Sequence, residues 1–227
     1  ACTTTPPVTE PMTAAPTPTR PAANVISMFS NAYTNVPVDT WQTVWSQGTV
    51  TNVQIQGNDT KKYTNLSFVG AETVASQINA TNMQYFHVDA WTPNMTQIRI
   101  KLVDFGANGI YQGTPNDDKE HELVFNAPAQ GSWISYDIPL SNFTGLTTRA
   151  NIAQLILSGN PAGTGTLFVD NVYFSDVAMA NESFANATVK IYPNPASNSI
   201  TLENESAIEL VSIYNVVGQE VKVAAPN

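Results

Sequence analysis

The sequence has one cysteine, two histidines and no long run of apolar residues. A single cysteine, Cys2, excludes a disulfide framework within the chain and a cysteine-rich zinc site. The histidines, His87 and His121, lack the close spacing of a metal-binding pair. A membrane-spanning helix needs about 20 predominantly apolar residues, so we expect no membrane insertion.

Positive charge is also scarce. The 227 residues include nine Lys and Arg against 18 Asp and Glu, which gives a formal net charge of −9. Nucleic acids and anionic membrane surfaces are bound through basic patches, so we exclude both as partners. The P-loop, the glycine-rich dinucleotide motif and the G-x-S-x-G nucleophile motif are absent from the sequence. A neutral or cationic ligand is the expectation that these absences leave.

Between residues 24 and 176 the sequence has the pattern of an all-β protein. Short segments rich in β-branched and aromatic residues recur about every ten residues, separated by turn formers. We expect nine strands, in NVISMF, VTNVQIQ, NLSFVG, YFHVDAW, QIRIKLVDF, HELVFN, SWISYDI, AQLILSG and TLFVDNVYF. Because no segment has helical periodicity, the pattern predicts an antiparallel β-sandwich of the jelly-roll type.

Composition divides the chain into four parts. Residues 1–22 contain six prolines and no hydrophobic periodicity, so we expect a semi-rigid linker there. The predicted sandwich covers 23–176, and a second linker covers 177–187. Residues 188–227 hold two further strand pairs, which bury too little for a complete domain, so we expect a truncated one. Cys2 is either a lipidated anchor or a thiol without a role.

Alternation along the predicted strands separates a core face from a polar face rich in aromatic residues. Leu66, Phe68 and Phe86 are on the core face. The opposite face would carry Tyr63, Asn65, Tyr85, His87, Asp89, Trp91, Arg99 and Lys101. Aromatic rings stack on sugar rings and planar charged groups bind paired hydroxyls, so this face predicts a carbohydrate-binding groove. The alternative is a surface ladder in which Asp89 pairs with a basic residue of the next strand.

The four tryptophans are candidates for stacking on a sugar. Trp91 ends a strand just before a turn and is the preferred exposed ring. Trp41 and Trp45 share one face of a predicted extended segment, where they form either a platform or a pair that caps the core. Trp133 begins a strand, and for this residue packing is the favoured role.

Oxygen ligands for calcium occur in two places. The loop 104–122 offers six candidate ligands, Asp104, Asn108, Asn116, Asp117, Asp118 and Glu120, but it lacks EF-hand spacing and is better explained as a solvated hairpin tip. Asp170, in LFVDNVYF, together with Ser30 would bind a structural ion that joins the first and last strands. For glycoside hydrolysis, the only pair of carboxylates that could face each other across strands is Asp89 with Glu122, so we expect no enzyme.

Several segments between residues 23 and 176 resemble those of a known family. The segments KKYTNLSFVG, FHVDAWTPNMTQIRIKLVDFGANG, KEHELVFN and GTLFVDNVYF resemble jelly-roll carbohydrate-binding modules. These are modules of secreted polysaccharide-degrading proteins of Bacteroidetes, of the type attached to laminarinases. The resemblance covers about residues 23–176. It implies a β-glucan such as laminarin as ligand, and a structural calcium held by the VDNV segment.

The tail of the chain resembles the C-terminal sorting domain of the type IX secretion system. The segments KIYPNPAS and IYNVVGQEV carry this resemblance. It implies export by the type IX machinery and a secreted or cell-surface location, and it disfavours a lipid anchor at Cys2.

We therefore expect a monomeric, non-catalytic module that targets its parent protein to a neutral polysaccharide. The ligand would be bound by stacking and hydrogen bonds from Trp91, Tyr85, Trp41, Trp45, His87, Asp89, Arg99, Lys101 and Asn65. The alternatives are a structural or adhesive spacer, whose aromatic residues would all be buried, and a glycoside hydrolase or lyase.

Overall fold

The structure is a computed structural model that describes residues 9–176, 190–192, 199, 201–203, 211–214 and 220–224. The chain divides into two compact units, residues 1–179 and residues 180–227. Among the described residues, no helix has the length and apolar character needed to span a membrane.

The first unit is all-β, as predicted, and its nine strands fall in the nine expected segments. They are β1 (Val25–Phe29), β2 (Gln47–Ile55), β3 (Asn58–Glu72), β4 (Tyr85–Trp91), β5 (Gln97–Asp104), β6 (Lys119–Asn126), β7 (Trp133–Pro139), β8 (Ile152–Asn160) and β9 (Gly165–Ser175). The unit also has three short 3-10 helices: η1 (Ala22–Asn24) precedes β1, η2 (Val74–Ser76) follows β3, and η3 (Leu140–Asn142) follows β7.

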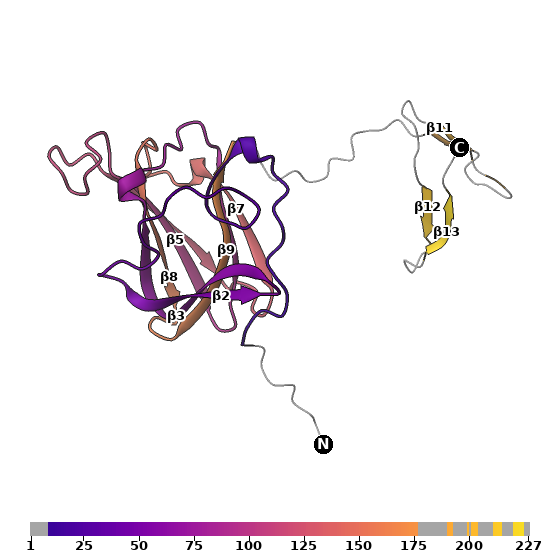
Figure 1. The fold of residues 1–227 in the computed structure, drawn as a ribbon, viewed down its shortest axis with the longest axis horizontal. Helices are drawn as coiled ribbons and strands as arrows, with labels where there is room; N and C mark the ends of the chain where they lie inside the picture. The colour runs from indigo at the N-terminus through magenta and orange to yellow at the C-terminus, as the bar shows by residue number, and fades with distance from the viewer. Residues whose placement is uncertain are drawn as a thin grey trace, which may run out of the picture. The chain divides into compact units, whose positions relative to one another are not determined.

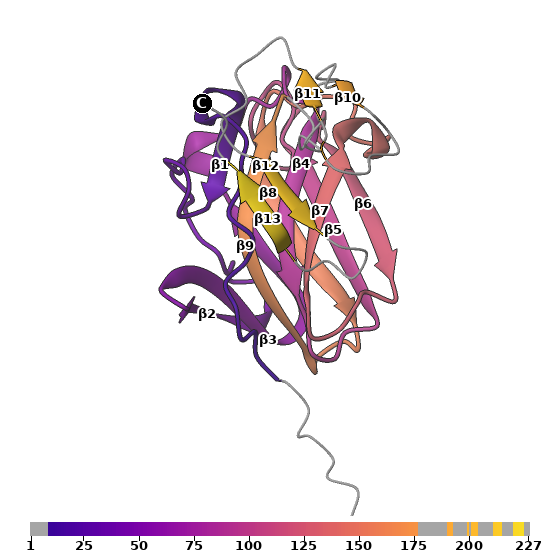
Figure 2. The same cartoon turned by 90° about the vertical axis from the view of Figure 1, so that its right-hand side faces the viewer.

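The strands form one curled antiparallel sheet with the order β6-β5-β8-β3-β9-β4-β7, to which β1 adds on β9 and β2 adds on β3. Strand β3 belongs to both halves of the curl. Its residues 68–72 pair with β8, and its residues 61–66 pair with β9. The sheet therefore closes into two facing layers (Figures 1 and 2). We call β6, β5, β8 and the end of β3 the β5 layer, and the start of β3, β9, β4 and β7 the β4 layer.

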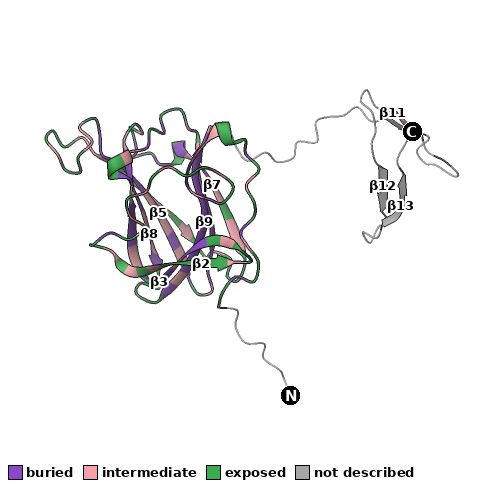
Figure 3. Ribbon diagram, viewed as in Figure 1, coloured by how far each residue is buried: buried purple, intermediate pink, exposed green. Residues whose placement is uncertain are grey.

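The hydrophobic core lies between the two layers. Phe86 and Val88 point into it from β4, and Ile98, Ile100 and Leu102 point into it from β5. All five are at most 1% exposed, which confirms the predicted core faces of these two strands. Strand β9 is buried along almost its whole length (Figure 3), because it is covered on both sides.

Strand β3 departs from the predicted alternation. Asn65 has a left-handed backbone, with φ of 51°, and the register shifts around it against β2 and β9. Between Tyr63 and Leu66 strand β3 has one residue more than β9, and between Thr64 and Phe68 it has two more than β2; each extra residue exchanges the faces beyond it. Tyr63 is therefore buried in the core rather than on the polar face, and Phe68 is half-buried on the outer face rather than in the core.

The prediction of a linker over residues 1–22 is wrong for residues 9–22, because these residues pack on the outer face of the β4 layer. We call residues 9–22 the strap. Its side chains Ala15 and Arg20 are 7% and 5% exposed, and the carbonyl of Pro16 accepts a hydrogen bond of 2.9 Å from Asn171 in β9. Proline and threonine segments do not form a core, but an extended segment can dock where its carbonyls find donors. Residues 1–8 lie outside the described residues.

The second unit contains the two strand pairs predicted from the tail. Strand β10 (Lys190–Tyr192) pairs with β11 (Thr201–Glu203), and β12 (Val211–Tyr214) pairs with β13 (Glu220–Ala224), both antiparallel. The predicted linker 177–187 lies outside the described residues.

Candidate functional site

The predicted polar face does not exist as one surface. Strands β4 and β5 are consecutive in the chain, but β8, β3 and β9 separate them in the sheet. The β4 residues and the β5 residues of the predicted set therefore lie in different layers, on opposite sides of the sandwich. Neighbouring strands in sequence are usually neighbours in space. Here the chain crosses to the other layer instead, which alternation within one strand does not reveal.

The β4 part of the predicted set is buried beneath the strap. His87, Asp89 and Trp91 are each at most 2% exposed, so the prediction of an exposed Trp91 is wrong. The Trp91 ring packs edge-on against Phe168 of β9, with 5.4 Å between centroids. Tyr85, at the other end of β4, is half-buried.

Beneath the strap, His87 lies between two carboxylates. Its Nε2 is 3.3 Å from Asp89, its Nδ1 is 3.3 Å from Asp137, and its ring stacks on Tyr173 with 4.5 Å between centroids. Burial lowers the pKa of His87, and the hydrogen bonds to Asp137 and Asp89 raise it by more, so its pKa lies above the ordinary value. Arg20 of the strap forms an ion pair with Asp137 and donates to the Tyr173 hydroxyl at 2.6 Å. These groups connect the strap to the sheet.

The β5 part of the predicted set lies in a groove on the outer face of the other layer. Directly paired residues share a face, and the register places Phe68, Ser158 and Arg99 in one row across β3, β8 and β5. The next row contains Gly70, Ile156, Lys101 and Glu122. The cavity above these rows has a volume of about 500 Å³, and Trp45 forms part of its wall. We call it the Trp45 groove.

Trp45 is the exposed aromatic ring of this groove, at 39% exposure. Its ring stacks on Phe68, with 6.2 Å between centroids and 24° between planes. Thr43 and Ser46, on either side of Trp45 in the chain, both bind the backbone of Gly70. The Thr43 amide donates to the Gly70 carbonyl at 3.1 Å, and the Gly70 amide donates to Ser46 Oγ at 3.1 Å. The ring is thus held over the sheet by the chain on both sides of it.

Ion pairs line the opposite side of the groove. Arg99 contacts Glu122 at 3.2 Å, and Lys101 contacts Glu120 at 2.8 Å. The alternative pairing of Asp89 with a basic residue of β5 is wrong, since they lie in opposite layers. The same separation removes Asp89 and Glu122 as a catalytic pair. The groove therefore combines one fixed aromatic ring with balanced charges.

Two other predicted residues lie outside the groove lining. Trp41 is half-buried and packs edge-on against Phe29, with 5.6 Å between centroids, so it does not form a platform with Trp45. Asn65 is exposed at the bulge of β3. Sequence reasoning missed Phe68, because of the bulge, and Ser158. Alternation along β8 could have found Ser158, because it lies one residue beyond the core residue Leu157.

The proposed calcium ligands, Asp170 and Ser30, bind different groups of Asn171. Asp170 accepts a hydrogen bond from the Asn171 amide at 2.6 Å and another from the side chain of Asn58, whereas Ser30 donates to the side chain of Asn171 at 2.7 Å. Burial raises the pKa of Asp170 to about 6. Within the described residues, no three His, Cys, Asp or Glu side chains form a metal-binding group. Calcium prefers six to eight oxygen ligands, so an ion here would need oxygens besides those of Asp170 and Ser30.

Comparisons with known proteins bear on both units. Residues 190–227 match the family described as "Secretion system C-terminal sorting domain", which confirms the predicted sorting tail and indicates a secreted or cell-surface protein. No curated protein sequence matches the chain.

The first unit has the fold of solved carbohydrate-binding modules. A family 30 module has 15% sequence identity and a TM-score of 0.51, over 71% of this chain and 91% of that one. The family 30 module of the cellulosomal cellulase Cel9D-Cel44B of Clostridium thermocellum has 14% identity and a TM-score of 0.50, over 66% and 96% of the two chains. The likeness confirms the predicted jelly-roll sandwich.

Proposed function

We propose that the Trp45 groove binds a neutral polysaccharide, and that the protein is a carbohydrate-binding module without catalytic activity. The observation that carries the proposal is the Trp45 ring, exposed to 39% yet held over Gly70 and Phe68. Such a ring suits the apolar face of a sugar, and the polar side chains beside it suit the hydroxyls. The fold that the unit shares with family 30 carbohydrate-binding modules supports this function.

The charges of the groove favour a neutral ligand. Arg99 and Lys101 are each paired with a glutamate, and the chain has a formal net charge of −9, which repels polyanions. Among neutral polysaccharides we propose a β-glucan such as laminarin, because the sequence resembles modules attached to laminarinases.

The acidic residues in the groove, Glu122, and beside it, Glu120, do not suggest hydrolysis. Glu120 and Glu122 lie two residues apart on β6, and each binds a basic residue of β5. Glycoside hydrolysis needs two carboxylates on either side of the scissile bond. A spacer domain is the second candidate, because the same pairs resemble a surface ladder that only stabilises the sheet.

The sorting tail supports a function outside the cell. We propose that the type IX machinery exports the parent protein, and that the module, acting as a monomer, holds that protein on its polysaccharide. A single exposed ring with a few hydrogen bonds supports an affinity of roughly micromolar to millimolar.

We also propose, separately, a structural calcium ion near Asp170 and Ser30, which the family resemblance implies. Binding would require these side chains to exchange their present hydrogen bonds for the ion.

The function is tested by affinity electrophoresis of the full chain through gels that contain laminarin, mixed-linkage glucan, xylan or alginate. We expect retardation by one neutral polysaccharide, and loss of that retardation in Trp45→Ala. The matched control is Val44→Ala, which changes the neighbouring, fully exposed side chain. No retardation in any gel would refute the proposal and support the spacer.

A further inference from the structure

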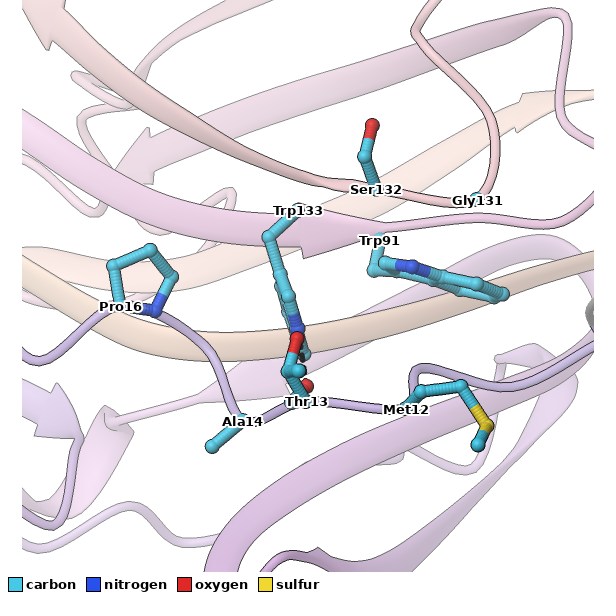
Figure 4. A pocket seen from close by; sticks show the side chains of 8 residues that line it. All are labelled: Met12, Thr13, Ala14, Pro16, Trp91, Gly131, Ser132 and Trp133. Carbon is cyan, nitrogen blue, oxygen red and sulfur yellow. Dashed lines mark hydrogen bonds between the residues drawn. The ribbon is translucent and has the colours of Figure 1, made fainter. Parts of the chain in front are cut away.

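The strap does not seal the outer face of the β4 layer. Where it crosses the ends of β4 and β7, a cavity of about 440 Å³ lies between the strap and the sheet (Figure 4). We propose that this cavity is a second carbohydrate site, which takes one neutral sugar unit and acts independently of the Trp45 groove. The proposal of this second site rests on the proposed function only in taking a carbohydrate as the class of ligand.

Two tryptophans from adjacent strands form the aromatic part of the cavity. Trp91 of β4 and Trp133 of β7 are directly paired across the strands, so their side chains share a face. Trp91 is 2% exposed and contributes to the floor, whereas Trp133 is half-buried and extends from β7 towards the strap (Figure 4). Met12 of the strap is 78% exposed and borders the same space. The Trp133 ring and the Met12 thioether give a sugar an apolar surface, and the buried Trp91 ring supports it from below.

The cavity is held in shape by the strap itself. The Trp133 indole N–H donates to the carbonyl of Thr13 at 2.8 Å, which fixes the ring and the strap to each other. Ala15, two residues further on, is buried. On the far side, Gly131 donates to the Thr92 carbonyl at 2.9 Å in a left-handed conformation with φ of 76°. A site that is ordered before binding loses less entropy when it binds.

The chemistry of the lining selects the ligand. Among the described residues that line the cavity, none is charged, so a charged ligand would find no partner there. Thr13 is exposed, and its hydroxyl can bind that of a sugar, whereas the Ser132 side chain points away from the strap (Figure 4). A Cβ atom at Gly131 would have no neighbour within 4 Å, so the space beside this residue is open to a ligand. The volume lies within the range of small-molecule sites, about 300–1,000 Å³.

The two sites lie on opposite layers of the sandwich. A single polysaccharide chain in the Trp45 groove therefore leaves the strap cavity free for another chain, or for a distant part of the same one. Two weak sites on one module increase the effective affinity for a dense polysaccharide by multivalency.

The test uses the indole N–H resonances of the four tryptophans in the full, ¹⁵N-labelled chain. Glucose-, xylose- and mannose-based hexasaccharides are titrated in turn, and the signals are assigned with single Trp→Phe variants. We expect the Trp133 signal to shift with one neutral oligosaccharide, with the same dissociation constant in wild type and in Trp45→Ala. In Met12→Ala, which changes an exposed side chain, we expect the same shift with a dissociation constant a few-fold weaker.

The outcomes separate the two proposals. If the Trp45 signal shifts and the Trp133 signal does not, the second site is refuted and the first stands. If the Trp133 shift disappears in Trp45→Ala, the sites are not independent, which also overturns the inference. If neither signal shifts with any probe, both proposals fail. Trp133→Ala and Trp133→Phe both remove the indole N–H that Thr13 accepts, but Trp133→Phe keeps an aromatic ring and is therefore the matched variant. We expect it to keep at least part of the binding, followed by the indole signal of Trp91, which lines the same cavity.

Discussion

The indole ring of Trp45 occupies the space in which a side chain at position 70 would lie. A Cβ atom built on Gly70 would be 2.1 Å from Cη2 of Trp45 and 2.6 Å from Cζ2. The absence of a side chain at this position of β3 thus allows the ring to lie directly on the sheet. The geometry of the Trp45 groove depends on this contact.

We expect Gly70→Ala to displace the ring and to weaken polysaccharide binding about tenfold, or about 1.4 kcal/mol. Stability should fall by no more than about 1 kcal/mol, because the ring is partly exposed and can move outward. Titration calorimetry and urea unfolding measure the two effects. In a Trp45→Ala background the same substitution should not weaken binding further. Wild-type affinity in Gly70→Ala would contradict the proposed site.

Arg99→Met distinguishes ligand binding from a surface ladder. An exposed ion pair contributes up to about 1 kcal/mol to stability, whereas a charged hydrogen bond to a ligand contributes about 1.5–3 kcal/mol when it is well shielded. Since Arg99 is partly exposed, we expect a loss of about tenfold in affinity with little change in the urea midpoint. Lost stability with unchanged binding would instead support the spacer.

Arg20 anchors the strap, so its removal should release the strap. The Arg20–Asp137 pair is largely buried, and breaking such a pair costs about 3–5 kcal/mol. We expect Arg20→Met to lower the free energy of unfolding by about 3 kcal/mol and to expose the strap to limited proteolysis. Lys62→Met is the control, because its pair with Glu10 is exposed and should contribute less than about 1 kcal/mol. Equal effects of the two variants would contradict the anchoring role.

His87 should make stability depend on pH. Because its folded pKa is raised above the ordinary value of about 6.5, protonated His87 stabilises the fold fully below that pH. This contribution is lost as the pH rises through the folded pKa. The charged and titratable groups around the ring are Asp89, Asp137, Arg20 and Tyr173. We expect the difference in unfolding free energy between wild type and His87→Gln to shrink from about pH 5.5 to about pH 8.5, measured by urea titration; a constant difference would contradict the raised pKa.

Calcium removal tests the proposed ion at Asp170. If the ion is bound, EDTA lowers the melting temperature of the full chain, and calcium restores it. Asp170→Asn should then melt at the same temperature with and without EDTA. An unchanged wild-type melt in metal-stripped buffer would refute the ion without affecting the polysaccharide proposals.

Local patterns were reliable wherever one strand was considered alone. The segments of β4 and β5 have their core residues at every second position, and Phe86, Ile98 and Leu102 are buried as predicted. The exception is β3, where extra residues around Asn65, itself in a left-handed conformation, put Tyr63 in the core and Phe68 on the outer face. Asparagine adopts this conformation more readily than most residues, but its presence alone does not predict a bulge.

The candidate site was predicted only in part. Trp45, Arg99 and Lys101 were selected from residue type and alternation, and they meet in one groove. Trp91 was selected for the same reasons, yet it is buried. Trp91 is buried because the strap covers its face of the sheet. The strap is distant from Trp91 in the sequence, and its proline content indicated a linker.

The order of apolar and polar residues along the chain determined the strands and their core faces, and hence the sandwich, because side-chain direction within a strand follows from the backbone alone. The sorting tail was predicted from the resemblance of KIYPNPAS and IYNVVGQEV to a known family. The tertiary structure alone decided which outward faces adjoin and which are covered. The order of strands in the sheet put β4 and β5 on opposite sides, and Arg20 brought the strap onto one of them. Both depend on contacts between residues distant in sequence, which no local pattern records.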